Sequence, residues 1–554
     1  MDHNPLEQEI ARLFAATFGL AESALDIDTP LVELGADSLL LFDLADVLAQ
    51  RYAIRLTVRQ FFADITTVRQ VANCIAQQRL TTAKVNKAPQ GLAPNSALPA
   101  QASLLPEQSA GNGGPVARDA QPADTEARRR YLQEFIPRYN AKTRASKQHA
   151  EAVRRVIADS RSAIGFSGAE VRDIDGNNYI DMTMGFGAHL FGHCPDFIQH
   201  ALETSLAKSF GLGVRHEQAL AVANLVTEIT GMQRVAFVNS GTEAVMNAVR
   251  VARAYTRRDR VVMFTTSYHG HWDGVLATPG QRLDAGATQP LSVGTPTNMV
   301  ADVTVLEFGS PAALTFIEQH ASEIAAVLIE PVPTRDPTLA SADHLRQLRA
   351  ITAHQGILLI FDEIVTGFRV HPAGVQGLYG IEADLVTYGK TLGGGMPLGV
   401  IAGRGNILDA IDGGGWSYGD NSYPATETTF FGGTYFQHPL SLAAAHATLM
   451  EIKRRGMSLS RELSQKTDAL VLRLNQLFRD RRLPIVACAF GSFFRLMHRE
   501  NFDLLYYNLL LRGVYIWEWR CWFLSTAHNQ THLDLVYNAF TDSLDHLQNN
   551  QLLP

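Results

Sequence analysis

Two residues that can perform chemistry stand in the second half of this 554-residue chain: Asp362 in GILLIFDEIVTGFR and Lys390 in DLVTYGKTLGGGMPLG. Asp362 ends an apolar stretch, where a carboxylate is costly unless a cation pairs with it. Lys390 follows a second apolar stretch and precedes glycines 393–395, which permit a tight backbone path. A lysine amine can condense with the aldehyde of pyridoxal 5'-phosphate (PLP), and a carboxylate can keep the ring nitrogen protonated. The pair predicts a PLP site in which Lys390 is also the general base.

A phosphate-binding turn is expected at Ser240, Gly241 and Thr242, in the stretch VAFVNSGTEAVMNAV. The pattern predicts a strand, a turn and a helix, and the free amides at a helix N-terminus bind anions. Taken alone, the turn is better explained by an ordinary serine or threonine helix cap.

Two further positions complete the expected site. Tyr268 and His269 follow the apolar stretch RVVMF, so either ring could stack on the pyridine of PLP. Burial as ordinary core aromatics is the alternative for this pair. Glu363 competes with Asp362 for the ring nitrogen, and strand alternation lets only one of the two carboxylates face the site.

The residues from 126 to 554 alternate between short apolar strands and helical stretches, among them RVAFV, RVVMF, AAVLIEP and GILLIFDE. This alternation predicts an α/β domain with a mostly parallel sheet. Residues 1–80 instead show helical spacing of apolar residues at about 6–20, 39–52 and 66–80. Residues 81–125 are rich in Pro, Ala, Gly, Ser and Gln, which predicts a disordered linker.

Ser38, in the stretch LGADSLL, stands where a second helix is expected to begin. A helix cap is the simplest explanation of the serine alone. Around it, however, the acidic residues have no Lys or Arg among them: Asp26, Asp28, Glu33, Asp37, Asp43 and Asp46. The first 80 residues resemble the acyl or peptidyl carrier proteins. That resemblance implies an all-α four-helix fold, a 4'-phosphopantetheine arm on Ser38, and recognition by a phosphopantetheinyl transferase.

The bulk composition narrows the functional classes. A net charge of -7 argues against nucleic-acid binding, which usually needs a basic face. The polar, acidic N-terminus does not suit a signal peptide, and the apolar runs are far shorter than the roughly 20 residues needed for a membrane span. The four cysteines are scattered without paired spacing. We therefore expect a cytoplasmic protein.

From about Asp173 onward, an ordered series of motifs resembles the class III (ω-) aminotransferases, which include glutamate-1-semialdehyde aminomutase. The motifs are NSGTEA, YHGHWDG, LIEPV, FDEIVTGFR, YGKTLGGGMPLG and FFGGTYFQHP. The resemblance implies a fold type I enzyme, with a large domain and a smaller α+β domain built from the N- and C-terminal segments. It also implies a homodimer in which Thr434 reaches the cofactor phosphate of the neighbouring subunit.

The stretch GVYIWEWRCWFLSTAH resembles aminotransferase domains within hybrid polyketide/nonribosomal peptide synthetases. One departure is Pro333, near which that subgroup often has glutamine. Glu330, three residues earlier, is expected to be structural. Arg215 and Arg369 are nearby cations, each expected to form a structural ion pair, so the amino donor stays open.

Joining a carrier serine to a transaminase predicts that a β-ketoacyl thioester, loaded by an upstream synthase, is converted into a β-aminoacyl thioester. An amino acid would supply the nitrogen. Three alternatives remain open. The enzyme could aminate a free aldehyde or ketone released from the assembly line, or act as an aminomutase on one substrate. The fold could also be an inert carrier and docking scaffold.

Overall fold

The computed structural model describes residues 5–18, 26–29, 31, 48, 52, 67–85, 125–156, 165–208, 211–213, 215–280, 288–417, 419–517 and 519–553. The chain divides into two compact units, Met1–Gln108 and Ser109–Pro554. Among the helices in these ranges, none combines the length and apolar character that a membrane crossing requires.

The first unit contains two well-described helices, α1 (Pro5–Phe18) and α4 (Val68–Val85). They pack through a small apolar cluster that includes Ile10, Phe14 and Val71, as the helical spacing in the sequence predicts. Arg69 pairs with Asp28 at 2.6 Å. Ser38 and most of the helix expected over 39–52 lie outside the described residues.

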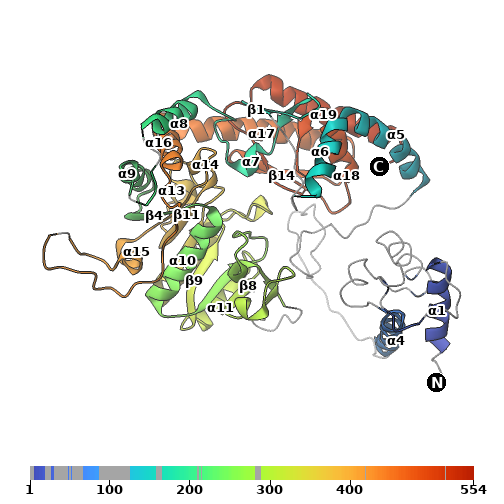
Figure 1. Cartoon of the computed structure of the whole chain (residues 1–554), viewed down its shortest axis with the longest axis horizontal. Helices are drawn as coiled ribbons and strands as arrows, with labels where there is room; N and C mark the ends of the chain where they lie inside the picture. Colours follow the sequence, from blue (N-terminus) through green and yellow to red (C-terminus); the bar gives the residue numbers. More distant parts are fainter. Residues whose placement is uncertain are drawn as a thin grey trace, which may run out of the picture. The chain divides into compact units, whose positions relative to one another are not determined.

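The second unit is built on a seven-stranded sheet in the order β4-β12-β11-β10-β9-β5-β8 (Figure 1). The strands are β4 (Arg234–Val238), β12 (Gly399–Gly403), β11 (Leu385–Tyr388), β10 (Leu358–Asp362), β9 (Ile324–Ile329), β5 (Arg260–Phe264) and β8 (Val303–Leu306). Strand β12 runs antiparallel to both neighbours, and every other pairing is parallel. The mostly parallel sheet predicted from the sequence is confirmed.

Helices cover both faces of this sheet, so its central strands are apolar on both sides. In β5, Val261 and Met263 face one apolar cluster, whereas Val262 and Phe264 face the other. The first face is covered by α10 (Gly241–Thr256) and α15 (Gly405–Asp412). The second is covered by α9 (Gln218–Thr230), α11 (Pro311–Gln319), α12 (Ala342–Gln355), α13 (Gly374–Tyr379), α14 (Lys390–Gly393) and α16 (Pro439–Arg455).

A smaller α+β part combines segments from both ends of this unit, as expected. Strand β15 (Val514–Tyr515) joins β1 (Gly165–Ser167), β2 (Glu170–Arg172) and β3 (Asn178–Asp181), while β13 (Val486–Phe490), β14 (Phe493–Met497) and β16 (Trp522–Phe523) form a second sheet. Figure 1 shows α5 (Glu126–Lys142) and α6 (Arg144–Arg154), both teal, beside the red α18 (Asp503–Leu511) and α19 (Gln530–Asn549). Helix α17 (Met457–Asp480) completes this layer.

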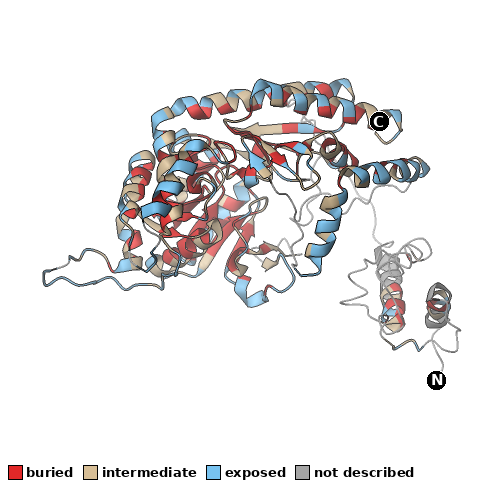
Figure 2. Cartoon of the chain, turned by 45° about the horizontal axis from the view of Figure 1, so that its top comes forward, coloured by how far each residue is buried: buried red, intermediate tan, exposed pale blue. Residues whose placement is uncertain are grey.

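The remaining elements connect these parts. They are α7 (Met184–Gly187), α8 (Asp196–Lys208), the 3₁₀ turns η2 (Asp273–Val275), η3 (Thr297–Val300) and η4 (Pro337–Leu339), and the hairpin of β6 (Ala277–Pro279) and β7 (Thr288–Pro290). After α15, residues 413–417 and 419–437 form an arm, called the 413–437 arm below; it is orange in Figure 1, and Figure 2 shows it as mostly exposed. Tyr423 is 75% exposed and Phe430 is 80% exposed on this arm.

Candidate active site

Most of the residues predicted for the PLP site gather at one edge of the seven-stranded sheet. Because β4, β5, β9, β10 and β11 run in the same direction, their carboxyl ends meet at this edge. Ser240 follows β4, Asp362 ends β10, and Lys390 follows β11. Tyr268 follows β5 and Glu330 follows β9. In open α/β sheets the carboxyl edge is where ligands bind.

Asp362 is the central acid of this edge. Its carboxylate, 6% exposed, lies 2.7 Å from Nδ1 of His269 and accepts hydrogen bonds from Thr387 Oγ1 and Ile364 N, both at 3.2 Å. The Nε2 atom of His269 is buried and has no hydrogen-bond partner. His269 therefore orients Asp362 by hydrogen bonding, which leaves Tyr268 as the better-placed candidate for stacking on a ligand ring.

Glu363, the competing acid, points into a different environment. It accepts hydrogen bonds from Thr366 Oγ1 at 2.9 Å, Val375 N at 2.7 Å and Gln376 N at 3.0 Å. These contacts anchor the first turn of α13. Strand alternation thus separates the two neighbouring carboxylates, and Asp362 is the one beside the other site residues.

Lys390 begins the short helix α14 and is half-buried. Gly394 and Gly395 behind it have φ values of 58° and 96°, which are accessible to glycine at little cost. Burial lowers the pKa of the Lys390 amine, while the nearby carboxylates of Asp362 and Glu330 act in the opposite direction. A lowered pKa raises the fraction of neutral amine, the form that attacks an aldehyde.

The turn before α10 packs closely against the neighbouring strand and the Lys390 turn. Ser240 caps the helix by accepting a hydrogen bond from Glu243 N at 3.2 Å. A Cβ atom on Gly399, in the adjacent strand, would lie 2.2 Å from the carbonyl oxygen of Ser240. Ile364 contacts both turns, because a Cβ on Gly241 or Gly389 would lie 3.0 or 3.1 Å from its Cδ1. The N-terminal end of α10 and the Lys390 turn are therefore neighbours.

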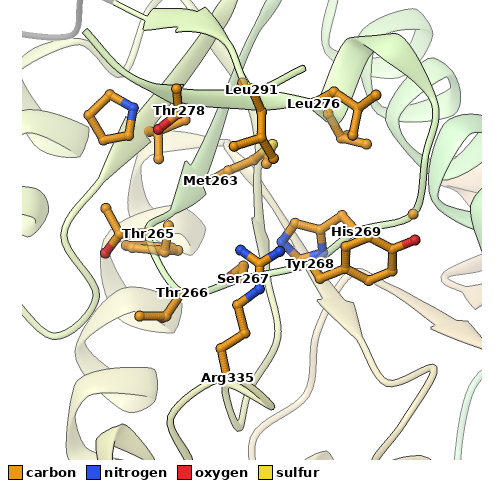
Figure 3. Close-up of a pocket in the computed structure, with 16 residues that line it drawn as sticks. Met263, Thr265, Thr266, Ser267, Tyr268, His269, Leu276, Thr278, Leu291 and Arg335 are labelled. Carbon is orange, nitrogen blue, oxygen red and sulfur yellow. The ribbon is translucent and has the colours of Figure 1, made fainter. Parts of the chain in front are cut away.

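Tyr268, which follows β5, is 48% exposed. Its backbone amide donates to Glu330 Oε1 at 2.8 Å, and the other oxygen of Glu330 accepts from Thr334 N at 2.6 Å and Thr334 Oγ1 at 2.9 Å. Burial raises the pKa of Glu330. Glu330 thus joins the segments after β5 and β9, a structural role as the sequence indicated. Figure 3 shows Tyr268 and His269 beside the side chain of Arg335.

Thr242 lies at the start of α10, where its Oγ1 accepts a long hydrogen bond from His271 N at 3.4 Å. A Cβ on Gly270 would lie 2.6 Å from the same oxygen, so the turn after β5 packs directly on this helix end. Thr434, by contrast, is exposed on the 413–437 arm. Ser38 lies outside the described residues, and its role stays a prediction.

The structure corrects the expectation for Arg369. The residue is 1% exposed, but the partners of its guanidinium are neutral oxygens: Ser492 Oγ at 2.8 Å, Thr391 Oγ1 at 3.3 Å, Val365 O at 3.1 Å and Gly187 O. The prediction of an ion pair was wrong, since hydroxyl and carbonyl oxygens satisfy the donors. Arg215 is exposed ahead of α9.

Three residues near the site were missed by sequence reasoning: Thr387, Ile364 and Cys521. The sheet register pairs Thr387 with Asp362, a relation that needs the strand order. Cys521 comes from the far C-terminal part, where its Sγ donates to Thr334 O at 2.8 Å. The only local signal for Cys521 was its place in the WEWRCWF stretch.

These features fit PLP. A helix N-terminus with two hydroxyl residues suits the phosphate, a buried acid suits the ring nitrogen, and an amine with a lowered pKa suits the aldehyde. The unpartnered Nε2 of His269 shows that this edge retains unused hydrogen-bonding capacity.

Comparison with known proteins decides the family. Residues 161–501 match the family model of aminotransferase class-III, and residues 8–75 match that of the phosphopantetheine attachment site. The chain belongs to the class-III aminotransferases. This class-III aminotransferase carries a fused carrier domain, and it takes PLP and 4'-phosphopantetheine as cofactors.

Curated and solved relatives agree with this assignment. The aminotransferase is 34% identical over 417 residues to a glutamate-1-semialdehyde 2,1-aminomutase of Methanothermobacter thermautotrophicus, covering 72% of this chain and 95% of that protein. An omega-transaminase from Sphaerobacter thermophilus shares 29% identity with a TM-score of 0.66, covering 73% and 98% of the two chains. A β-phenylalanine aminotransferase from Variovorax paradoxus shares 26% identity with a TM-score of 0.66, covering 77% and 99%.

Proposed function

We propose that this aminotransferase converts a β-ketoacyl thioester, held on the phosphopantetheine arm of Ser38, into a β-aminoacyl thioester. The observation that supports the proposal is the match of one chain to both a phosphopantetheine attachment site and a class-III aminotransferase, with a buried acid held by His269 at the sheet edge. An amino acid donor would give up its nitrogen and leave as a 2-oxo acid. The keto oxygen of the acyl chain would then leave as water.

Each site residue has a part in this chemistry. When bound, PLP supplies an electron sink and a carrier for the transferred nitrogen. The turn of Ser240, Gly241 and Thr242 would hold its phosphate. Asp362 would keep the ring nitrogen protonated. Lys390 would hold the aldehyde at rest and then move the proton at the reacting carbon of the substrate.

The aromatic residues and the neighbouring subunit complete the assignment. Tyr268 would cover one face of the ring, and His269 would hold Asp362 in place through the 2.7 Å contact. Thr434 would reach the phosphate bound by the partner subunit. The exposed aromatic residues of the 413–437 arm support such a homodimer, because an isolated chain would leave them in water.

The β position is favoured for two reasons. A β-ketoacyl thioester has two carbonyl groups. An amine that attacked the thioester carbonyl would release the acyl chain from the arm, whereas the β-ketone can accept the amine while the chain stays attached. In addition, the solved relative from Variovorax paradoxus is named as an aminotransferase of β-phenylalanine, a β-amino acid. This relative supports a site with room for a carbonyl group at that position.

The order of the domains suits delivery of the carrier-bound acyl chain to the aminotransferase site. We assign residues 1–80 to the carrier domain, 81–125 to a linker and 126–554 to the aminotransferase domain. Residues 81–85 continue helix α4, so the predicted linker starts after Val85, and residues 86–124 lie outside the described residues. A flexible linker of about 40 residues has an r.m.s. span of roughly 35 Å and gives effective concentrations near the millimolar range. The acyl chain would come from an upstream synthase of a polyketide, nonribosomal peptide or amino-lipid pathway in the cytoplasm.

The test uses the full-length protein, with acetoacetyl-phosphopantetheine transferred to Ser38 by a phosphopantetheinyl transferase. After incubation with amino acids, the ejected pantetheine fragment is weighed, because the change from ketone to amine is small relative to the intact chain. We expect the amine mass with wild type and the ketone mass with Lys390→Ala. A wild-type protein with bound PLP that leaves the ketone unchanged with every amino acid contradicts the proposal.

The Ser38→Ala variant separates the alternatives. If a free aldehyde or ketone is the acceptor, this variant retains the turnover of wild type on that compound. Turnover without any added amino acid would instead indicate an aminomutase. Protein that stays colourless after addition of PLP would indicate an inert scaffold.

A further inference from the structure

Arg369 is a buried cation for which the chemistry described above has no use. It is 1% exposed and lies in the loop that follows β10. In the described residues no carboxylate forms an ion pair with it, and neutral oxygens accept its hydrogen bonds. Burial lowers the pKa of Arg369 to about 9, so the guanidinium still carries its charge at neutral pH. Because a buried cation without a counter-ion is destabilising, its charge calls for a functional explanation.

The fold brings Arg369 to the turn that carries Lys390. A tight turn follows β10, and Phe368 takes a left-handed φ of 60° within it. The ring of Phe368 packs against that of Tyr388 at a centroid distance of 4.9 Å. Tyr388 ends β11, just before Lys390. The guanidinium of Arg369 therefore reaches the first turn of α14, where it donates to Thr391 Oγ1 at 3.3 Å.

The same guanidinium contacts three segments outside the seven-stranded sheet. Its Nη1 donates to Ser492 Oγ at 2.8 Å, between β13 and β14, and its Nη2 donates to Gly187 O at the end of α7. The ring centroid of Phe523, on β16, lies 5.1 Å from its central carbon. Arg369 is thus held from several sides, and its charge has a fixed place beside the Lys390 turn.

The contact with Gly187 supports an unusual stretch of backbone. All four residues of α7 have positive φ values, from 45° at Met184 to 89° at Gly187. Left-handed backbone is unfavourable for Met184 and Phe186, which carry side chains. Such a conformation persists only where its surroundings hold it. Arg369 is one of the groups that hold it, and through Arg369 the geometry of α7 is linked to that of the Lys390 turn.

Charged groups act on the Lys390 amine from several elements. Burial is the largest influence and lowers the pKa of Lys390. Asp362 at the end of β10 and Glu330 after β9 act in the opposite direction, because both favour the protonated amine. The positive charge of Arg369 disfavours the protonated amine. Cys521 adds no charge at neutral pH, since burial raises the pKa of its thiol to about 11.

We propose that Arg369 is a positioning residue that acts on the reaction through Lys390, because its charge, fixed beside the Lys390 turn by four neutral oxygens, opposes protonation of the amine. The neutral amine is the form that attacks an aldehyde and that accepts a proton as a base. Neutral partners suit this role, since a carboxylate beside the guanidinium would cancel its effect on Lys390. The inference rests on the role of Lys390 in the proposed function and is independent of the acyl acceptor.

The experiment titrates the visible absorbance of the full-length holoenzyme with pH, without any substrate. This absorbance reports whether the nitrogen that joins the cofactor to Lys390 is protonated. In Arg369→Met we expect the midpoint to rise by about one pH unit, which is about a tenfold change in the protonation equilibrium. Arg369→Lys keeps the charge and should keep the wild-type midpoint. The matched control is Arg349→Met, which removes an arginine paired with Asp384 at 2.8 Å at the opposite edge of the sheet and should leave the midpoint unchanged.

A second variant serves if Arg369→Met does not fold. Ser492→Asp leaves the guanidinium in place and gives it a carboxylate partner, so the midpoint should again rise, whereas Ser492→Asn, of matched size, should not change it. In cofactor-free protein, the pH dependence of acetylation of the Lys390 amine should show the same order of variants. Mass spectrometry measures this acetylation, with the exposed Lys147 as the reference amine.

The outcomes separate this inference from the proposed function. A wild-type midpoint in Ser492→Asp or in folded Arg369→Met overturns the inference. An equal rise in Arg369→Lys and Arg369→Met also overturns it, because packing and not charge would then be responsible. Failure of the wild-type protein to aminate a thioester contradicts only the proposed function, since neither titration uses a substrate.

Discussion

Exchange of Asp362 for asparagine tests whether Asp362, and not its neighbour Glu363, is the acid that serves the cofactor ring. The carboxylate accepts hydrogen bonds from Thr387 Oγ1 and Ile364 N and lies 2.7 Å from His269 Nδ1. Asparagine keeps the size of the side chain and removes the charge that would hold the ring nitrogen in its protonated state. Loss of one preorganised electrostatic contact in a buried site typically costs about 3–4 kcal/mol in the transition state. We therefore expect the donor half-reaction to slow by about a hundred- to a thousandfold.

The matched control is Glu363→Gln, one residue away and equally buried. Its carboxylate accepts from Thr366 Oγ1, Val375 N and Gln376 N, so an amide would place NH₂ against at least one donor. We expect this variant to lose about 1–3 kcal/mol of unfolding free energy and to keep the half-reaction rate of the folded protein. The assay is stopped-flow absorbance with bound cofactor quantified beforehand. A wild-type rate in Asp362→Asn together with a slow Glu363→Gln would refute the assignment.

Three further predictions concern the cofactor turn, acid stability and assembly. Gly399→Ala should weaken PLP affinity, measured by fluorescence titration, because its Cβ would collide with Ser240 O, whereas Gly415→Ala points into open space and should not. Burial lowers the pKa of His498 and of His528 to about 4, below the usual value of about 6.5, so the unfolded chain binds protons first and stability should fall as pH drops from 6.5 toward 4. Thermal unfolding at several pH values checks this, and His498→Phe should reduce the fall. Phe430→Glu should dissociate the proposed homodimer in light scattering, while Leu472→Glu, exposed on α17, should leave it intact.

Much of the site could be predicted from local sequence. The apolar strand before Asp362 and the glycines after Lys390 are features that short stretches encode directly. Alternation along β10 also required that only one of Asp362 and Glu363 face the site, and the structure separates them as required. These successes share a cause, since each depends on residues within a few positions of one another.

Other features depend on contacts between distant segments, which a single sequence does not reveal. The partner of His269 is 93 residues away, so the ring could only be considered for stacking until the strand order was known. Arg369 was expected to form an ion pair, but the fold surrounds it with neutral oxygens. Cys521 comes to the site beside β16, a strand of only two residues with a weak local signal, which pairs with β14.

The most direct test of the account is covalent trapping of the cofactor at Lys390. Borohydride reduction of the full-length protein with PLP bound fixes the cofactor to the amine that holds it, and proteolysis followed by mass spectrometry locates the label. We predict a single phosphopyridoxyl group on the peptide that contains Lys390, with no labelling in Lys390→Ala. Cofactor-loaded protein that is labelled at another lysine, or at none, would contradict the account.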